Sequence, residues 1–401
     1  MWTINGKFLL RDNRGLSQRE FQSTRQLCDQ LRRLVEDRAA YIEEHQLDEL
    51  FCRPDGNWSY AKNDYHRTFK EISGCRYEFI NWLRLFMPFF SGYHLRYVSG
   101  TPGAPSFAEI SPQLEREIEA LLDVPDEWVH RWIALVSRIP ADYIFAPPKF
   151  LGEIGWDVSG VVVNHDTCVY QERINLLYEA GIFDWLNDRL SAQGHLRFLE
   201  IGAGYGALGF KLKSLYPASD YWICDLPESL LFAAIYLSLN RPDCGTGIGV
   251  EAPCGFTFMP NYMIDKIRGA FDLVINTLSF SEMSAHQLRI YAQKIREIIP
   301  NGFLFEQNQD NKHLGLICAQ EILTEYFAFH QRVKTSTGWK MKQGIPNLWS
   351  NNPINISARG KSLKRRCWNI MVRVVWLRSL LRRATLSFCR KLLSRNETVR
   401  D

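Results

Sequence analysis

The order of hydrophobic and polar residues predicts a helical first part of the chain. Leucines recur at helical spacing within residues 16–50, behind the capping-box motif Ser17-x-x-Glu20. An aromatic-rich segment follows at 77–97, and Pro112 and Pro125 stand where further helices would begin. We therefore expect residues 1–150 to form a mostly helical domain that caps an acceptor site.

From residue 151 onward the pattern changes. Glycines punctuate the run Val161-Val-Val163, which predicts a strand or hairpin, and a helix is expected over 171–190. Strand-like and helix-like runs then alternate. The strands are predicted at 196–201, 221–225, 256–259, 271–276 and 302–306, and the helices at 207–215, 227–240, 284–299 and 315–327. Such alternation predicts an α/β core, 151–343, whose parallel sheet is covered by helices on both faces.

The end of the chain departs from this alternation. The polar run 328–343 is expected to supply late antiparallel strands, giving a mixed sheet of seven, and 344–360 is expected to be a linker. Residues 361–401 contain twelve Lys or Arg and two acids, a charge of +10. Tryptophans and leucines are interspersed among these cations without a helix breaker. We predict a basic amphipathic helix, with 361–395 making reversible contact with an anionic membrane surface. Packing on protein is the main alternative for this segment, and nucleic acid is not an expected partner.

Composition is that of a globular protein. The 401 residues are 46% hydrophobic and 23% charged, which excludes a disordered chain and suggests two domains. The net charge is +4, so the part before residue 361 carries −6. Ten cysteines are scattered with no CxxC spacing, and the first residues do not resemble a signal peptide. We expect a cytoplasmic protein with reduced thiols, peripheral at the inner face of the membrane if the tail binds there.

A glycine-rich turn carries the strongest chemical signal. The predicted strand ending at Glu200 runs into Gly202-Ala-Gly204-Tyr-Gly206, directly before a predicted helix. A strand–glycine turn–helix unit brings backbone N–H groups and a helix N-terminus to a small ligand. The glycines alone suit either a nicotinamide dinucleotide or S-adenosylmethionine. Glu200 favours the second, since a carboxylate there would face the donor's amino group and sulfonium but repel a pyrophosphate.

Further polar residues follow the next strands. Asp225, with Leu226 after it, is placed to accept the two ribose hydroxyls, although it could also cap the following helix. Asn276 and Glu282 should border the pocket, Glu282 either as a general base or as a partner of the helix dipole.

The fifth predicted strand ends in Glu306 and Asn308. We rank a base or substrate-binding role for this pair above a metal site, because further hard ligands are lacking at a telling spacing.

These motifs together resemble a family of sugar O-methyltransferases, class I enzymes that use S-adenosylmethionine. The resemblance covers roughly 145–345 and rests on Glu200-x-Gly-x-Gly-x-Gly, Asp225-Leu-Pro-Glu, the segment 279–283, Glu306-x-Asn308, and the segment 163–171. It implies a Rossmann-like class I methyltransferase core and a sugar or glycan acceptor in polysaccharide biosynthesis. It also implies that Asn164, Tyr170 and Gln171 close over the donor or the acceptor. A local role, with Asp166 and Thr167 capping a helix, is the alternative.

The sequence therefore predicts an S-adenosylmethionine-dependent O-methyltransferase acting on a sugar hydroxyl. Cofactor contacts are expected from Glu200, the three glycines, Asp225, Leu226 and Asn276; catalysis from Glu282 or Glu306; and substrate binding from Asn164, Tyr170, Gln171 and Asn308. Two alternatives stay open: an NAD(P)-dependent oxidoreductase, and a non-catalytic, membrane-tethered protein that retains a vestigial cofactor fold.

Overall fold

The computed structural model describes residues 2–55, 58–59, 65–86, 112–122, 126–333 and 344–356. The predicted basic helix, its membrane contact at 361–395 and the end of the predicted linker lie outside these ranges. So does 334–343, which is most of the run 328–343 that was expected to add strands.

Among the described residues, an eight-stranded sheet forms the centre of the molecule, with the strand order β10-β11-β9-β8-β4-β5-β7-β6. Six neighbouring strands, from β9 to β6, run parallel to one another, and β11 is antiparallel to both β9 and β10. The strands are β4 (Leu196–Ile201), β5 (Ser219–Asp225), β6 (Thr246–Ile248), β7 (Phe256–Pro260), β8 (Leu273–Thr277), β9 (Phe303–Asn308), β10 (Phe329–Arg332) and β11 (Ile345–Ser350). This mixed, mostly parallel sheet confirms the predicted Rossmann-like α/β core.

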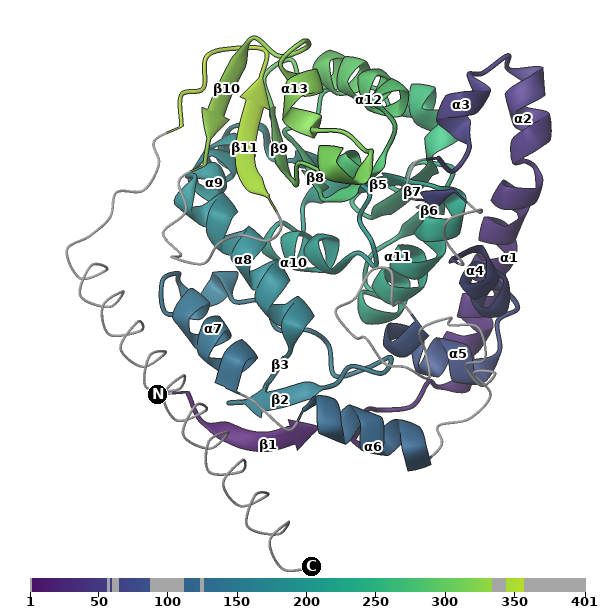
Figure 1. Cartoon of the computed structure of the whole chain (residues 1–401), viewed down its shortest axis with the longest axis vertical. Helices are drawn as coiled ribbons and strands as arrows, with labels where there is room; N and C mark the ends of the chain where they lie inside the picture. Colours follow the sequence, from purple (N-terminus) through teal and green to yellow (C-terminus); the bar gives the residue numbers. More distant parts are fainter. Residues whose placement is uncertain are drawn as a thin grey trace, which may run out of the picture.

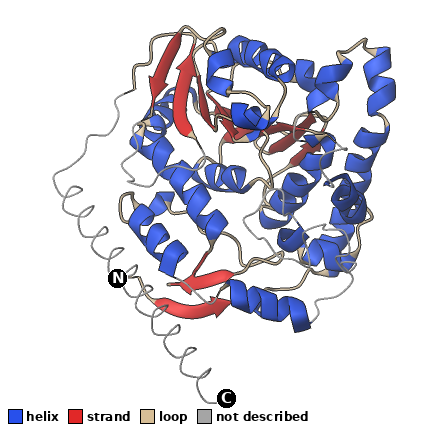
Figure 2. Ribbon diagram, viewed as in Figure 1, coloured by secondary structure: helices blue, strands red, loops and turns tan. Residues whose placement is uncertain are grey.

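Helices cover both faces of the sheet (Figures 1 and 2). Successive strand residues point to opposite faces, so Phe198 packs in one hydrophobic cluster and Leu199 in another. The first cluster involves α8 to α11, and the second involves α12 and α13. The helices are α8 (His165–Glu179), α9 (Ile182–Gln193), α10 (Ala207–Leu215), α11 (Pro227–Asn240), α12 (Ala285–Ile298) and α13 (Ala319–Leu323).

The N-terminal part packs against this core and shares its hydrophobic cluster. Helix α1 lies along α11 (Figure 1), and Leu31 of α1 belongs to the same cluster as Leu230 of α11. Ser17 and Glu20 form the predicted capping box. The helices here are α1 (Gln18–Glu36), α2 (Arg38–Glu44), α3 (Glu49–Cys52), α4 (Tyr65–Ser73), α5 (Tyr77–Asn81), α6 (Pro112–Leu121) and α7 (Asp126–Val136), with the 3-10 turn η3 (Leu83–Phe86).

A small antiparallel sheet joins the start of the chain to the lead-in of the core. The predicted hairpin is present as β2 (Gly155–Val158) and β3 (Val161–Val163), and β1 (Ile4–Phe8) pairs with β2. No strand was predicted near the N-terminus, because β1 is short and largely exposed and so carries little periodic signal.

Several boundaries differ from the prediction. The helix expected over 171–190 begins at His165, because Asn164 caps it, and Gly181 divides it into α8 and α9. The helix expected over 315–327 is reduced to the five residues of α13. The sheet has eight described strands rather than seven, since β6 is a three-residue edge strand that periodicity cannot detect.

The linker predicted at 344–360 was wrong for its first part, which forms β11. Its sequence, Ile-Pro-Asn-Leu-Trp-Ser, contains residues typical of loops. Pro346 O accepts a hydrogen bond from Val333 N, so the proline nitrogen also faces the β10 side, beyond the last paired residue of β10. The proline therefore leaves the ladder between β11 and β9 intact.

Candidate functional site

The turn between β4 and α10 depends on its glycines. Gly202, Gly204 and Gly206 have φ angles of 71°, 58° and 84°, a region that other residues adopt only with strain. A Cβ atom on Gly202 would lie 2.1 Å from Ser279 Oγ. The backbone of this turn thus approaches the loop after β8 more closely than a side chain would allow.

A cavity of about 280 Å³ opens at the carboxyl ends of β4, β5 and β8. Ligands of doubly wound sheets bind at this edge. Its walls are the turn 202–204, Asp225 with Leu226, the loop 277–283, and one face of α8. Trp58 lines it from the N-terminal part of the chain. The cavity therefore combines the predicted core with the region predicted to cap it.

The predicted site residues divide into two groups. Six line the cavity: Tyr170, Gly202, Gly204, Asp225, Leu226 and Glu282. Seven lie outside its lining: Asn164, Gln171, Glu200, Gly206, Asn276, Glu306 and Asn308. Hydrogen bonds hold six members of the second group, and the seventh, Gly206, lies against Leu237 where α10 begins.

Asp225 is the carboxylate at the end of β5. Its Oδ1 accepts a hydrogen bond from Leu226 N at 2.8 Å, and Oδ2 has no hydrogen-bond partner among the described residues. Burial, with the nearby charges of Glu200, Glu228 and Glu282, raises the pKa of Asp225 to about 7. The ionised form of such a carboxylate would be stabilised by hydroxyl donors of a ligand or by a nearby cation.

Two buried polar atoms in the cavity-lining side chains lack partners within the described ranges. Among the described residues, Arg173 Nε has no hydrogen-bond partner and no carboxylate lies within ion-pair distance of this side chain. Its guanidinium carbon lies 4.9 Å from the centre of the Tyr170 ring. Asn261 donates to Phe51 O through Nδ2 at 3.0 Å, while its Oδ1 accepts nothing. A buried cation and a buried acceptor of this kind indicate places for an anionic group and an N–H donor of a ligand.

Glu200 stands behind the glycine turn rather than in the cavity. Tyr221 OH donates to its Oε2 at 2.7 Å, and burial raises its pKa to about 7. Arg173 acts in the opposite direction on the Glu200 pKa, so these two side chains are electrostatic neighbours. Glu200 therefore lies outside the cavity lining, where its predicted contact with the donor would be made.

Asn276, Asn308 and Glu306 form a hydrogen-bonded chain beneath the cavity. Asn276 donates to Ile201 O at 2.8 Å, and Asn308 donates to Asn276 Oδ1 at 3.0 Å and to Glu306 Oε2 at 2.9 Å. Glu306 is fully buried and also accepts from Gln320, Asn347 and Trp349. The structure does not bring Glu306 to the cavity, and this position supports the loop after β8 rather than catalysis.

The polar residues of the segment 163–171 are held mainly by the protein itself. Asn164, rather than Asp166 or Thr167, caps α8 by accepting from Thr167 N at 2.9 Å. Gln171 accepts from Phe145 N at 2.6 Å and donates to Asn175. Only Tyr170, of the three residues predicted to close over a ligand, lines the cavity.

Glu282 does lie in the cavity, at the end of the turn η6 (Ser279–Glu282). Trp58 Nε1 donates to its Oε2 at 2.7 Å. Burial raises the pKa of Glu282, and the Trp58 hydrogen bond partly offsets this. No sequence pattern links Trp58 to this carboxylate, because only the packing of the N-terminal part brings the two side chains together.

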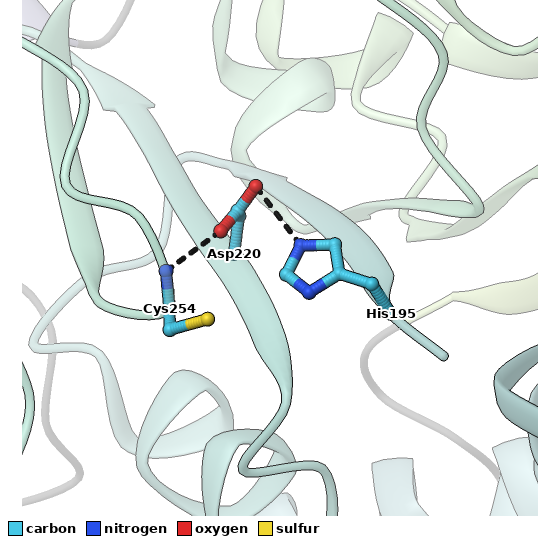
Figure 3. Close-up of side chains that lie close together, drawn as sticks. All are labelled: His195, Asp220 and Cys254. Atoms are coloured by element: carbon cyan, nitrogen blue, oxygen red, sulfur yellow. Dashed lines mark hydrogen bonds and ion pairs between the residues drawn. The ribbon is translucent and has the colours of Figure 1, made fainter. Parts of the chain in front are cut away.

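A different cluster of titratable residues lies at the amino-terminal ends of strands β4, β5 and β7, away from the cavity. His195, Asp220 and Cys254 come from the segments that precede or begin β4, β5 and β7 (Figure 3). Asp220 already accepts from His195 Nε2 at 3.1 Å and from Cys254 N at 2.8 Å, and it lies 3.5 Å from Arg197 Nε. A cation here would have to displace the Arg197 ion pair, so this cluster serves to join the strand starts.

The cavity residues fit S-adenosylmethionine, the donor implied by the sequence resemblance. Four acids line the cavity (Asp55, Asp166, Asp225 and Glu282) against one arginine, Arg173. That balance suits a ligand with a sulfonium, an ammonium and a single carboxylate, and it would repel a pyrophosphate. Asp225 would hold the ribose hydroxyls, Arg173 the carboxylate and Asn261 Oδ1 the adenine amino group.

Comparison with known proteins gives no identification. No protein-family model matches the chain, and no curated protein matches it. Among solved structures, it is similar to the S-adenosylmethionine-dependent methyltransferase SibL (13% identity, covering 46% of this chain and 58% of that one, TM-score 0.31). It is also similar to the bifunctional kinase-methyltransferase WbdD (16%, 56% and 47%, 0.36) and to the N-methyltransferase NodS from Bradyrhizobium japonicum WM9 (16%, 42% and 90%, 0.29).

The chain thus spans less than two thirds of SibL and of WbdD. TM-scores this low do not establish a common activity, so the functional case rests on the cavity residues. Within the described ranges, no helix is long and apolar enough to cross a membrane.

Proposed function

We propose that the protein transfers a methyl group from S-adenosylmethionine to a hydroxyl oxygen of a sugar. One observation carries the proposal: the glycine turn, the buried Arg173 and the Asp225 carboxylate meet in a single cavity rich in acids. Each of these groups would contact a different part of the donor. When bound, the donor supplies an electrophilic methyl carbon attached to a good leaving group.

The residues of the chain would bind and orient this donor. The glycine turn brings backbone to the edge of the cavity at a place where a Cβ on Gly202 would clash with Ser279. Arg173 would gain a carboxylate partner in a buried setting, where an unpaired charge is costly. Methyl transfer then needs the acceptor oxygen aligned with the reacting carbon and water excluded, a task for Trp58, Met283 and the face of α8.

The sugar acceptor is supported by the sequence resemblance. The segment 279–283, which contributes to that resemblance, supplies Ser279, Glu282 and Met283 to the cavity lining. A role in surface polysaccharide or glycan biosynthesis follows from the same resemblance. A place in the cytoplasm or at the inner face of the membrane follows instead from the scattered cysteines and the basic tail of the sequence.

Calorimetric titration tests the donor. Wild-type protein should bind S-adenosylmethionine and S-adenosylhomocysteine but not NAD. Arg173→Gln should weaken S-adenosylhomocysteine binding by at least about 10-fold, because it removes a charge-assisted hydrogen bond, whereas Arg32→Gln on the exposed face of α1 should not. Tight NAD binding without S-adenosylhomocysteine binding would refute the proposal in favour of an oxidoreductase.

Mass spectrometry of surface glycans tests the acceptor. Glycans from cells that lack the protein should each be lighter by one methylene unit at a sugar residue, and the wild-type gene should restore it. Donor binding without any change in the glycans would retain a methyltransferase but reject a sugar acceptor.

A further inference from the structure

One face of α8 forms a continuous wall of the cavity. His165, Asp166, Val169, Tyr170 and Arg173 line it, and their spacing of three and four residues places them on one side of the helix. His165 and Arg173 are two turns apart, about 12 Å along the axis. If Arg173 holds the donor carboxylate, His165 therefore lies well away from that carboxylate but still in the wall of the cavity.

The His165 ring is fixed by its neighbours. Its Nδ1 lies 3.0 Å from Asp166 Oδ1, and the ring meets Trp128 edge to face with centroids 4.8 Å apart. Asp166 is buried, and its other oxygen accepts from Arg84 Nη2 at 2.8 Å. The imidazole thus lies at the end of a series of hydrogen-bonded side chains that runs from Arg84 through Asp166.

This chain determines which nitrogen of His165 carries the proton. Burial opposes ionisation of Asp166, but the His165 hydrogen bond and the Arg84 charge outweigh it and hold the pKa of Asp166 well below its usual range. An ionised carboxylate only accepts hydrogen bonds, so Nδ1 must donate. In the neutral ring, Nε2 then carries the lone pair, and it has no hydrogen-bond partner in the part of the chain that the structure describes.

We propose that His165 is the general base that accepts the proton of the sugar hydroxyl, with Asp166 as its positioning residue. The inference rests on the proposed function. The acceptor oxygen forms its bond to the methyl carbon and gives its proton to Nε2, while the electron pair of the broken carbon–sulfur bond stays on sulfur. The resulting imidazolium is stabilised by Asp166.

The other carboxylates are less well placed for this proton. Glu306 lies outside the cavity, and Glu282 Oε2 already accepts from Trp58. The charge of Glu282 also contributes to raising the pKa of Asp225, the carboxylate assigned to the ribose.

Three variants separate this role from donor binding: His165→Gln, Asp166→Asn and the control His286→Gln. His286 is an exposed histidine of α12, paired with Asp48 outside the cavity lining. His165→Gln and His286→Gln should both leave S-adenosylhomocysteine affinity within about 3-fold of wild type, a small change in binding free energy. A loss of affinity in His165→Gln as large as in Arg173→Gln would overturn the inference, since His165 would then bind the donor.

Nuclear magnetic resonance of ¹⁵N-histidine protein reports the proton directly, without turnover. The His165 signals should show the Nδ1–H form, and Asp166→Asn should shift them toward a mixture. An Nε2–H form in the wild type would overturn the inference, because no lone pair would face the acceptor.

Restoration of glycan methylation in cells lacking the protein gives the catalytic readout. His165→Gln should lower it by about 100-fold or more, in the range expected for loss of a general base, and His286→Gln should not. Full restoration by His165→Gln would sink this inference while leaving the proposed function intact. Failure of the wild type to bind S-adenosylhomocysteine would sink both.

Discussion

Replacing Arg84 by methionine should destabilise the protein severely. Arg84 is fully buried in η3, and its guanidinium is ion-paired with Glu153 at 3.0 Å and with Asp166 at 2.8 Å. The guanidinium also lies 3.9 Å from the centre of the Tyr205 ring, next to the glycine turn. One side chain therefore connects η3, the segment before β2, the start of α8 and the glycine turn.

The expected cost follows from the charges left behind. Removing one partner of a buried ion pair costs about 3–5 kcal/mol, because the other charge stays buried without compensation. Loss of the contact with Tyr205 adds up to about 2 kcal/mol. Arg84→Met should therefore lower the free energy of unfolding by at least about 3 kcal/mol. Arg32→Met on exposed α1 should change it by less than about 1 kcal/mol, as expected for surface pairs.

Urea unfolding followed by tryptophan fluorescence measures this difference. The triple variant Arg84→Met/Glu153→Gln/Asp166→Asn should recover part of the loss, since it removes the stranded charges as well. If Arg84→Met stays within about 1 kcal/mol of wild type, or the triple variant is no more stable than the single one, the reasoning from buried charge is wrong.

Three further outcomes are expected. Gly202→Ala should weaken S-adenosylhomocysteine binding by at least about 10-fold in calorimetry, because the added Cβ would clash with Ser279 and the alanine would be strained at this positive φ. Gly194→Ala, with a similar φ but open space around the added Cβ, should retain binding. S-adenosylmethionine is a cation, so its binding should lower the raised pKa of Asp225. Near pH 7 this should release up to about half a proton, measured as a dependence of the binding enthalpy on the buffer. Asp225→Asn should abolish the release. Glu306→Gln should lower the free energy of unfolding in urea by about 1–3 kcal/mol, because its amide group would face donors such as Asn347. The variant should leave S-adenosylhomocysteine affinity unchanged. A selective loss of affinity would instead give Glu306 a direct role in binding.

The local signals in the sequence were sufficient to predict the parallel core. The run ending at Glu200 is hydrophobic and β-prone, and glycines follow it directly, so the strand, the turn and the helix could each be predicted from neighbouring residues. Asp225 followed from the same logic, because it ends the next strand. The turn and this carboxylate do line one cavity.

Residues whose positions depend on distant parts of the chain could not be predicted. Trp58 meets Glu282 only because α1 to α3 fold back over the core, and Asn261 is oriented by a carbonyl of α3. Arg173 and His165 carry a weak signal, their helical spacing along one face, which could have been noticed once α8 was placed. Glu306 was overvalued for the opposite reason: the end of a strand predicts a cavity edge, but not the four side chains that enclose this carboxylate.

The insertion of β11 between β9 and β10 bears on how the chain matures on the ribosome. Strands β9 and β10 are synthesised first and must remain separated until Ile345–Ser350 has left the exit tunnel. A nascent chain that stops before this segment keeps two unsatisfied strand edges, which are templates for aggregation. Premature termination near residue 344 should therefore produce insoluble protein, even though the glycine turn and every described residue of the cavity have already been translated.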